Sequence, residues 1–376
     1  MNVNQLRKKK LLLVLNNFQV GGVERLMLDI LSRLDRDKFG VEIATVVGTG
    51  PLEGEFRKLG FPIHLTGPSF DQGKRLFSKV RWVILTPLTL WKLIGIMRRI
   101  KVDLVLTCPY QADLLGILAA KMAGVEKRIL VQTDVAKLSP VRRFLKKWLS
   151  IVLSTKIIAI SAAVKDYIVN TWMAPAGKIE VIYPGIDFEK FRAKRKPGRI
   201  STIGIVGRLE EIRGPDIFAK AAIELKTEYL MEPDILFVGD GSMRGSLEEL
   251  VDSQLSKAQF VGSVLNVREW LSKIDLLVVP SRSEGFGLIL VEGLLSKCLM
   301  VASDIPVFRE IINDKNKSNL LFPVGDYKIL AKLLAEILKD PQKQNVLRGE
   351  IDEWIKKESH RFDIEKMAKS YEALLG

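Results

Sequence analysis

The chain of 376 residues has little cysteine, little histidine and no long apolar run. Its cysteines, Cys108 and Cys298, lie far apart, which argues against a disulfide framework and indicates a reducing compartment. No uncharged apolar segment approaches the roughly 20 residues that cross a bilayer. The apolar run Leu11–Leu15 is too short for a secretory signal, so we expect a strand there. We therefore expect a cytoplasmic protein, whose contact with any membrane is lateral.

Acidic residues are also scarce for a chain of this size. The sequence has 44 Asp and Glu against 58 Lys and Arg, a formal net charge of +14. A balance this basic indicates an anionic partner, a membrane surface, or both. Because the chain is too long for one ordinary hydrophobic core, we expect two domains.

Short apolar runs alternate with longer amphipathic segments throughout the chain, which is typical of parallel βαβ units. Helices are expected between the strands, for example at Val23–Leu34 and Ala112–Met122. The expected strands are Leu11–Leu15, Val41–Val47, Pro62–Leu65, Asp103–Thr107, Arg128–Gln132, Lys156–Ile160, Glu180–Tyr183, Thr202–Val206, Ile235–Val238, Gln259–Val261, Leu276–Pro280 and Leu299–Ala302.

The predicted fold class is α/β, with two Rossmann-like doubly wound domains that face each other across a cleft. The first domain is expected at residues 1–190 and the second at 191–358. The basic, Pro- and Gly-bearing run Arg192–Arg199 suits a linker between them. Residues 359–376, with a helix from His360 to Leu375, are expected to fold back and brace the first domain.

Glycine-bearing loops follow several predicted strands, where parallel sheets bind ligands. Gly21 and Gly22 open a helix after the first strand, so a phosphate or a sugar could approach the backbone there; a plain turn is the alternative. Arg208 and Arg213 flank one loop of the second half, and two guanidinium groups so placed could hold a diphosphate; two solvated charges are the alternative.

Two weaker signals also lie at predicted strand ends in the second half. Gly239, in the run Gly-Asp-Gly-Ser, could be a tight turn and nothing more. Val261 could belong to a backbone edge that binds a nucleotide base, or to an ordinary strand end. Neither residue identifies a function alone.

The segment SRSEGFGLILVEG, residues 281–293, places Glu284 and Glu292 eight positions apart around a glycine-rich turn. Glu284 precedes the turn and is expected to meet a sugar. Glu292 lies in an apolar run, where a charge without a partner is costly, and is within reach of a ribose. Carboxylates accept paired hydrogen bonds from vicinal hydroxyls. The alternative makes both acids ordinary residues of a helix start and a solvated helix face.

These motifs together resemble the retaining GT-B glycosyltransferases of the large fourth family, which use nucleotide-diphosphate sugars. The resemblance covers most of the chain, and its most specific part is Glu284-Gly285-Phe286-Gly287 with Glu292. It extends to the run from Gly21 to Arg25, to Val181–Asp187, and to Gly207-Arg208-Leu209 and Gly239-Asp240-Gly241.

The resemblance implies a role for each matching residue. Arg208 and Arg213 neutralise the donor diphosphate, on which charge develops as the sugar bond breaks. Glu284 binds the sugar hydroxyls, and Glu292 binds the ribose. Amides of the Gly285-Phe286-Gly287 turn lie near the sugar and phosphate, and Gly22 helps to seat the phosphate or the acceptor. The resemblance also implies a metal-independent hexosyltransferase without a cofactor, with the nucleotide sugar as donor substrate.

The sequence departs from the family pattern at two places. Arg213 stands where the family usually has lysine, so the charge is kept but its shape changes. Many members carry a histidine after the fifth strand of the first domain, where this chain has Thr133 and Asp134. Either that contact to the donor sugar is absent, or Thr133 or Asp134 replaces it.

Two basic stretches of the first half contain aromatic and aliphatic residues. One runs from Gln72 to Val102 without an acid and includes Trp82 and Trp91; the other is Val141–Trp148. This composition favours lateral docking on an anionic leaflet, on the inner face of the membrane, and a glycan or lipid-linked acceptor. The alternative is amphipathic helices packed on their own sheet with a solvated face.

We therefore expect a glycosyltransferase of cell-surface polysaccharide or glycolipid synthesis. One alternative is a sugar-nucleotide-binding protein of the same fold with impaired catalysis, which the missing histidine suggests. A basic nucleic-acid-binding protein is the less favoured alternative, because the sequence has no recognised nucleic-acid motif. Donor base, sugar, acceptor, linkage and oligomeric state are not determined by the sequence.

Overall fold

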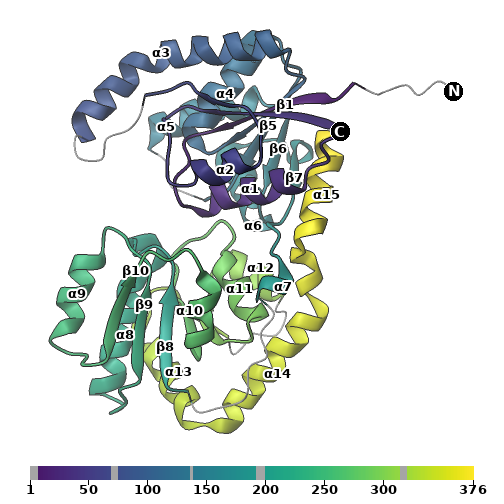
Figure 1. Ribbon diagram of the computed structural model, residues 1–376. Coiled ribbons are helices and arrows are strands. Elements are labelled where there is room, and N and C mark those ends of the chain that lie inside the picture. The colour runs from purple at the N-terminus through teal and green to yellow at the C-terminus, as the bar shows by residue number, and fades with distance from the viewer. Residues whose placement is uncertain (1–6, 69–74, 136–138, 192–199, 314–319) are drawn as a thin grey trace. The chain divides into compact units, whose positions relative to one another are not determined.

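The computed structural model describes residues 7–68, 75–135, 139–191, 200–313 and 320–376 (Figure 1). Of these, the side chains of residues 75–84, 143, 149 and 150 are not described. The chain divides into two compact units. The first comprises Met1–Gly185 with Ile364–Gly376, and the second comprises Ile186–Asp363. The expected boundaries, at 190/191 and 358/359, lie a few residues from these. The expected linker Arg192–Arg199 lies outside the described residues.

A parallel sheet of seven strands forms the centre of the first unit, in the order β3-β2-β1-β4-β5-β6-β7. The apolar residues of β1 are 0–1% exposed, because helices cover both faces of this sheet. The strands are β1 (Lys9–Leu15), β2 (Phe39–Thr45), β3 (Ile63–Leu65), β4 (Leu104–Cys108), β5 (Lys127–Gln132), β6 (Lys156–Ala159) and β7 (Ile179–Val181).

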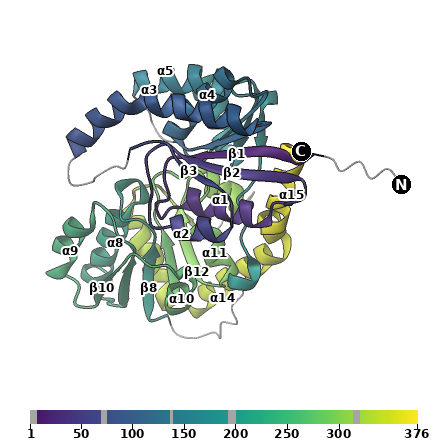
Figure 2. The same cartoon turned by 45° about the horizontal axis from the view of Figure 1, so that its top comes forward.

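Two helical layers enclose this sheet. Helices α3, α4 and α5 cover one face, and α1 and α2 lie on the other (Figures 1 and 2). The last helix, α15, packs against α1 within the same unit. The helices are α1 (Gly22–Arg33), α2 (Glu53–Lys58), α3 (Arg75–Ile100), α4 (Tyr110–Ala123), α5 (Pro140–Leu145), the π-helix η2 (Lys146–Val152), α6 (Ala162–Trp172), the 3-10 turn η3 (Ala176–Lys178) and α15 (Ile364–Leu375).

The second unit has a parallel sheet of six strands, in the order β10-β9-β8-β11-β12-β13. Its strands are β8 (Thr202–Val206), β9 (Asp234–Val238), β10 (Ala258–Gly262), β11 (Leu276–Val279), β12 (Leu299–Ser303) and β13 (Leu321–Phe322). Its helices are α7 (Phe188–Phe191), η4 (Glu211–Arg213), α8 (Pro215–Thr227), α9 (Arg244–Asp252), α10 (Val267–Lys273), α11 (Leu288–Leu295), α12 (Pro306–Ile312), α13 (Tyr327–Lys339), α14 (Pro341–Lys357) and η5 (Ser359–Phe362).

The predicted α/β class is confirmed, and every strand expected from the sequence is present. Strand β13 was not expected, because two residues are too short to show a pattern. The expected final helix from His360 is divided: the 3-10 turn η5 ends at Phe362, and α15 begins at Ile364. Among the described helices, none combines the length and the apolar character that a membrane crossing requires.

Candidate functional site

Most of the predicted binding residues meet at one edge of the second sheet. Strands β8 and β11 are neighbours in the sheet although they are not consecutive in sequence, so the strand order reverses between them. The loops that leave the carboxyl ends of these two strands therefore diverge and leave room for a ligand. Arg208 follows β8, Gly239 follows β9, Val261 lies in β10, and Glu284 follows β11.

The loops after β8 and β9 are held together by backbone contacts that require glycine. A Cβ on Gly239 would lie 1.8 Å from the carbonyl oxygen of Gly207, and φ at Gly239 is +139°. The amide of Leu209 donates to the carbonyl of Asp240 at 2.9 Å. Gly239 therefore sets the close approach of the two strand ends, and the side chain of Arg208, which follows Gly207, remains exposed.

Arg213 and Glu284 are in direct contact. A guanidinium nitrogen of Arg213 forms an ion pair with Oε1 of Glu284, whose side chain is 4% exposed. The Ser281 hydroxyl donates to the same oxygen at 3.0 Å. Burial and, to a smaller extent, the positive charge of Arg208 lower the pKa of Arg213 to about 10, so Arg213 stays protonated at neutral pH. Two cations and one buried carboxylate therefore share one site.

The turn that follows Glu284 presents its backbone, because its large side chain is buried elsewhere. Phe286 is 3% exposed, and its ring packs edge-on against Phe362 at 5.4 Å. Gly287 has φ of +94° and caps α11, and a Cβ there would lie 2.5 Å from the Phe308 ring. Gly285 is buried. Amides at the start of α11, rather than side chains, are thus the groups this turn can offer to an anion.

Two further predicted residues of the second unit are Glu292 and Val261. Glu292 is partly exposed on α11, between the buried residues Val291 and Gly293. The register between β10 and β9 shifts between Phe260 and Gly262, so Val261 is the extra residue of a bulge. A bulge frees the backbone groups of the extra residue from the ladder. That geometry supports a backbone edge at Val261.

The predicted residues of the first unit lie at the carboxyl edge of the first sheet. Gly21 caps α1, and a Cβ on it would lie 2.6 Å from a carboxylate oxygen of the buried Glu24. The carboxylate of Glu24 therefore lies directly beside the backbone of Gly21. Burial raises the pKa of the Cys108 thiol at the end of β4; the negative charge of Asp113 raises it further, and the positive charge of Lys146 opposes this.

Asp134 has a defined contact within its own loop. The Gln132 side-chain amide donates to the Asp134 backbone carbonyl at 2.8 Å and to its carboxylate at 2.7 Å. Gln132 is buried at the end of β5, so this pair fixes the loop that carries Thr133.

Two groups that shape the site were missed by the sequence analysis. Ser281 orients Glu284, and the side chain of Arg282 pairs with Asp216 at 2.7 Å. Both Ser281 and Arg282 lie in the segment that the sequence analysis singled out. Nothing in the sequence pattern pairs Arg282 with a residue at the start of α8, because that contact depends on two loops meeting in space.

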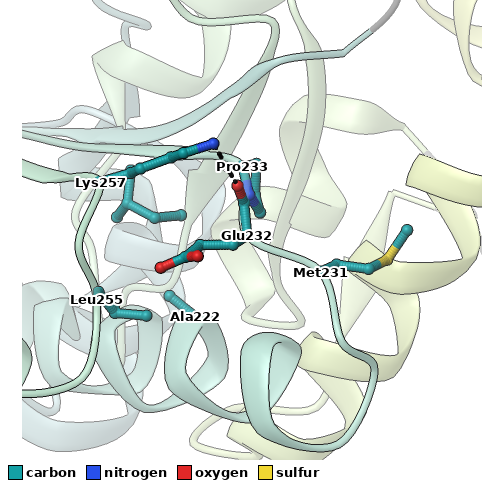
Figure 3. Close-up of a pocket in the computed structure, with 7 residues that line it drawn as sticks. Ala222, Met231, Glu232, Pro233, Leu255 and Lys257 are labelled. Atoms are coloured by element: carbon teal, nitrogen blue, oxygen red, sulfur yellow. Dashed lines mark hydrogen bonds between the residues drawn. The ribbon is translucent and has the colours of Figure 1, made fainter.

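A small hollow in the second unit lies at the opposite edge of its sheet, before β9 and β10 (Figure 3). Lys226 and Ser256 donate to the Glu232 carboxylate and hold its pKa at about 2. Lys257 is directed to the Glu232 backbone carbonyl, 3.4 Å away. The two charged side chains that line this hollow are therefore engaged with the protein, and we assign it no ligand.

No group of three or more His, Cys, Asp or Glu side chains suited to a metal ion occurs in the part of the chain that the structure describes.

Two family models match the chain in the order of its two units. The model described as Glycosyltransferase Family 4 matches residues 20–190. The model described as Glycosyl transferases group 1 matches residues 200–340, which contain the cluster around Arg213 and Glu284. Together the two matches cover most of the chain.

Curated relatives are similar over part of their length. The lipopolysaccharide core biosynthesis mannosyltransferase LpcC of Rhizobium leguminosarum bv. viciae is 28% identical over 43% of this chain and 50% of that protein. The D-inositol 3-phosphate glycosyltransferase of Segniliparus rotundus is 27% identical over 50% of this chain and 45% of that protein. The chain thus spans about half the length of the curated relatives it matches.

Solved structures share the fold over nearly the whole chain. Anabaena Alr3699/HepE in complex with UDP-glucose matches with a TM-score of 0.79 and 18% identity, over 97% of this chain and 99% of that one. A glycosyltransferase from Rickettsia africae ESF-5 matches with a TM-score of 0.75 and 19% identity, over 98% of both chains. With both domain models matched in order and the fold shared throughout, the chain belongs to the GT-B glycosyltransferases of family 4.

Proposed function

We propose that this protein is a retaining, metal-independent glycosyltransferase that moves a hexose-type sugar from a nucleotide-diphosphate sugar to a glycan or lipid-linked acceptor. The observation that carries the proposal is the cluster of Arg208, Arg213 and Glu284 at the point where the strand order of the second sheet reverses. A family 4 enzyme needs cations for a diphosphate and an acid for sugar hydroxyls, and this cluster supplies both.

The donor is proposed to bind the second unit through its diphosphate. Arg208 and Arg213 face the phosphates, and their charge stabilises the leaving group as the bond to the sugar breaks. The amides at the start of α11 add donors to the same group. Glu284 accepts hydrogen bonds from the sugar, and Glu292 from the ribose. The structural neighbour Alr3699/HepE binds UDP and UDP-glucose, which supports a donor of this class.

The ion pair between Arg213 and Glu284 implies an exchange of partners on binding. Without a donor, each group neutralises the other at the bottom of the site. With a donor bound, the guanidinium meets phosphate oxygens and the carboxylate meets hydroxyls. Each buried charge therefore keeps a partner when the donor binds. A buried charge without a partner would be costly in free energy. Arg213 and Glu284 therefore stabilise the empty site by pairing with each other, and they complement the phosphate and hydroxyl groups of the donor when it is bound.

The acceptor is proposed to bind the first unit. The Glu24 carboxylate lies directly beside Gly21 and is proposed to accept a hydrogen bond from an acceptor hydroxyl. A groove of about 530 Å³ also opens between β3 and α3, and its lining includes Lys92 and Arg99. Two cations beside a groove suit an acceptor that carries phosphate, such as a lipid-linked sugar. The name of one relative, a lipopolysaccharide core biosynthesis mannosyltransferase, supports an acceptor of cell-surface synthesis, and the name of another, a D-inositol 3-phosphate glycosyltransferase, supports an acceptor that carries phosphate.

Docking on the anionic inner face of the membrane is proposed for the helical layer that contains α3, α4 and α5 (Figure 2). Seven exposed apolar side chains are described in this layer, and three of them are aromatic, as in proteins that bind at membrane interfaces. They are Leu88, Trp91, Met122, Val141, Phe144, Trp148 and Val152. The start of the basic stretch, at Gln72, and the side chains of Trp82 and Arg143 lie outside the described residues. The protein is accordingly proposed to be cytoplasmic and peripheral to the membrane.

A second function follows from the loop after β5. Gln132 and Asp134 occupy each other there, in a loop where many family members have a histidine. A protein with this loop and an intact diphosphate site could bind a sugar nucleotide without transferring the sugar.

One assay separates the two functions. UDP-, GDP- and ADP-sugars are incubated with the full chain and a membrane extract, and release of the nucleoside diphosphate and sugar incorporation are both followed. The proposed enzyme releases the nucleoside diphosphate from one of the donors and transfers the sugar to an acceptor in the extract. Donor binding in calorimetry without release supports the impaired binder, and absence of both contradicts the donor site itself.

A further inference from the structure

Arg282 joins the two loops that carry the site. Its backbone amide donates to the carbonyl of Ile212 at 2.9 Å. One guanidinium nitrogen donates to the carbonyl of Glu211 and to a carboxylate oxygen of Asp216, both at 2.7 Å. The other donates to the second oxygen of Asp216 at 2.7 Å. Arg282 thus makes a bidentate pair and two backbone contacts, all across the boundary between the loops.

These contacts surround Arg213. Glu211 and Ile212 precede it in the 3-10 turn η4, and Asp216 follows it at the start of α8. Between them Gly214 has φ of +67°, and a Cβ on it would lie 2.0 Å from the carbonyl oxygen of Pro280. The two loops therefore touch through backbone on one side and through the Arg282 side chain on the other. The position of the Arg213 backbone relative to the β11 loop is fixed at both ends.

Glu284 lies on the Arg282 side of this junction, two residues farther along. The contact between Arg213 and Glu284 consequently depends on how the two loops are aligned, and Arg282 is the side chain that aligns them. A guanidinium is suited to this because its planar fork matches a carboxylate and leaves a donor for the carbonyl. Lysine at this position would keep the charge and lose the fixed geometry.

We propose that Arg282, through Asp216 and the carbonyl of Glu211, is a positioning residue that holds Arg213 and Glu284 in the arrangement required by the donor diphosphate. Three of the five N–H donors of the Arg282 guanidinium are directed at Asp216 and Glu211, so in this arrangement its role is to join the two loops. The inference rests on the proposed function and deepens it, since it assigns the alignment of the diphosphate site to a residue outside it.

The test compares nucleotides that differ by one phosphate. Calorimetry first finds which of UDP, GDP and ADP binds the wild-type chain, and then measures that diphosphate and its monophosphate with Arg282→Gln, Arg282→Lys and Asp216→Asn. The matched control is Arg309→Gln, which removes a pair with Asp304 that is local to one loop. Melting temperatures report on the fold of each variant.

Arg282→Gln and Asp216→Asn are expected to weaken diphosphate binding about tenfold and monophosphate binding by less than about threefold, because the lost alignment mainly affects the paired phosphate contacts. Arg282→Lys gives an intermediate loss, and Arg309→Gln none. If a variant loses equal affinity for both nucleotides and its melting temperature falls in proportion, Arg282 has a purely structural role and the inference is overturned. Unchanged affinity for the diphosphate would also overturn the inference. If the wild-type chain binds none of the three diphosphates, the proposed function fails as well. Should Arg282→Gln not fold, Asp216→Asn and Arg282→Lys decide the outcome.

Discussion

At the scale of single residues, the two glutamates of residues 281–293 have different surroundings. Glu284 is buried and touches Arg213 and Ser281, whereas Glu292 is partly exposed on the first turns of α11. The sequence predicted that both acids and the arginines serve one edge of one sheet. It did not predict that Arg213 and Glu284 touch, or that Arg282 aligns them, because contacts between distant loops leave no spacing pattern in a sequence.

Glu292→Gln is expected to weaken donor binding about tenfold, because the amide accepts one hydrogen bond from a ribose diol where the carboxylate accepts two charge-assisted ones. The matched variant Glu249→Gln changes an acid on α9 and leaves binding unchanged. Calorimetry with the preferred nucleotide sugar and with its 2′-deoxy analogue is the measurement. Glu292→Gln should lower the affinity for the ribose form more than for the deoxy form. An equal loss of affinity for both forms would show that Glu292 does not bind the ribose hydroxyls.

At the scale of elements, the strands could be predicted because buried parallel strands are short, apolar and bounded by turn residues. The tail was predicted less well, since the break before α15 depends on packing rather than on its helical pattern. The basic segment from Val141 to Trp148 was also only partly understood. Val141, Phe144 and Trp148 are exposed, but Lys146 is 3% exposed and forms an ion pair with Asp113, which is 1% exposed.

This buried pair anchors η2 to α4. The Thr107 hydroxyl donates to the other oxygen of Asp113 at 2.8 Å, so the carboxylate is held on two sides. Lys146→Met is expected to destabilise the first unit by about 3–5 kcal/mol, because it leaves the Asp113 charge buried without its cation. The double variant Lys146→Met with Asp113→Leu should recover most of that loss. Denaturant unfolding of the full chain measures both, and a single variant as stable as wild type would show that the pair contributes nothing.

At the scale of the whole molecule, the net charge of +14 supports the proposed membrane docking in a way that no single contact does. Helix α4 packs against both α3, where Trp91 is 74% exposed, and η2, which with α5 carries the exposed residues Phe144 and Trp148. Interfacial binding combines such apolar area with attraction to anionic lipid. Net charge alone would allow any part of the surface to bind anionic lipid. The exposed apolar side chains assign this binding to the first unit.

Reversing charge in that layer should therefore matter more than reversing it elsewhere. Arg142→Glu with Lys147→Glu is expected to weaken binding to phosphatidylserine vesicles in a pelleting assay about thirtyfold or more, because each basic residue near the surface contributes about 1 kcal/mol. Lys328→Glu with Lys332→Glu makes the same change of charge on exposed positions of α13 and serves as control. If both double variants lose binding equally, net charge and not this surface governs docking.

The central claim is that Arg213 and Glu284 form the centre of a donor site for sugar transfer. It is tested most directly by the rate of transfer at saturating donor for wild type, Arg213→Ala and Arg213→Lys. The account predicts that Arg213→Ala lowers kcat about 10²–10³-fold, because a charge that stabilises the departing diphosphate is lost. Arg213→Lys, which keeps the charge, should stay within about tenfold of wild type. A wild-type rate in Arg213→Ala would contradict the account.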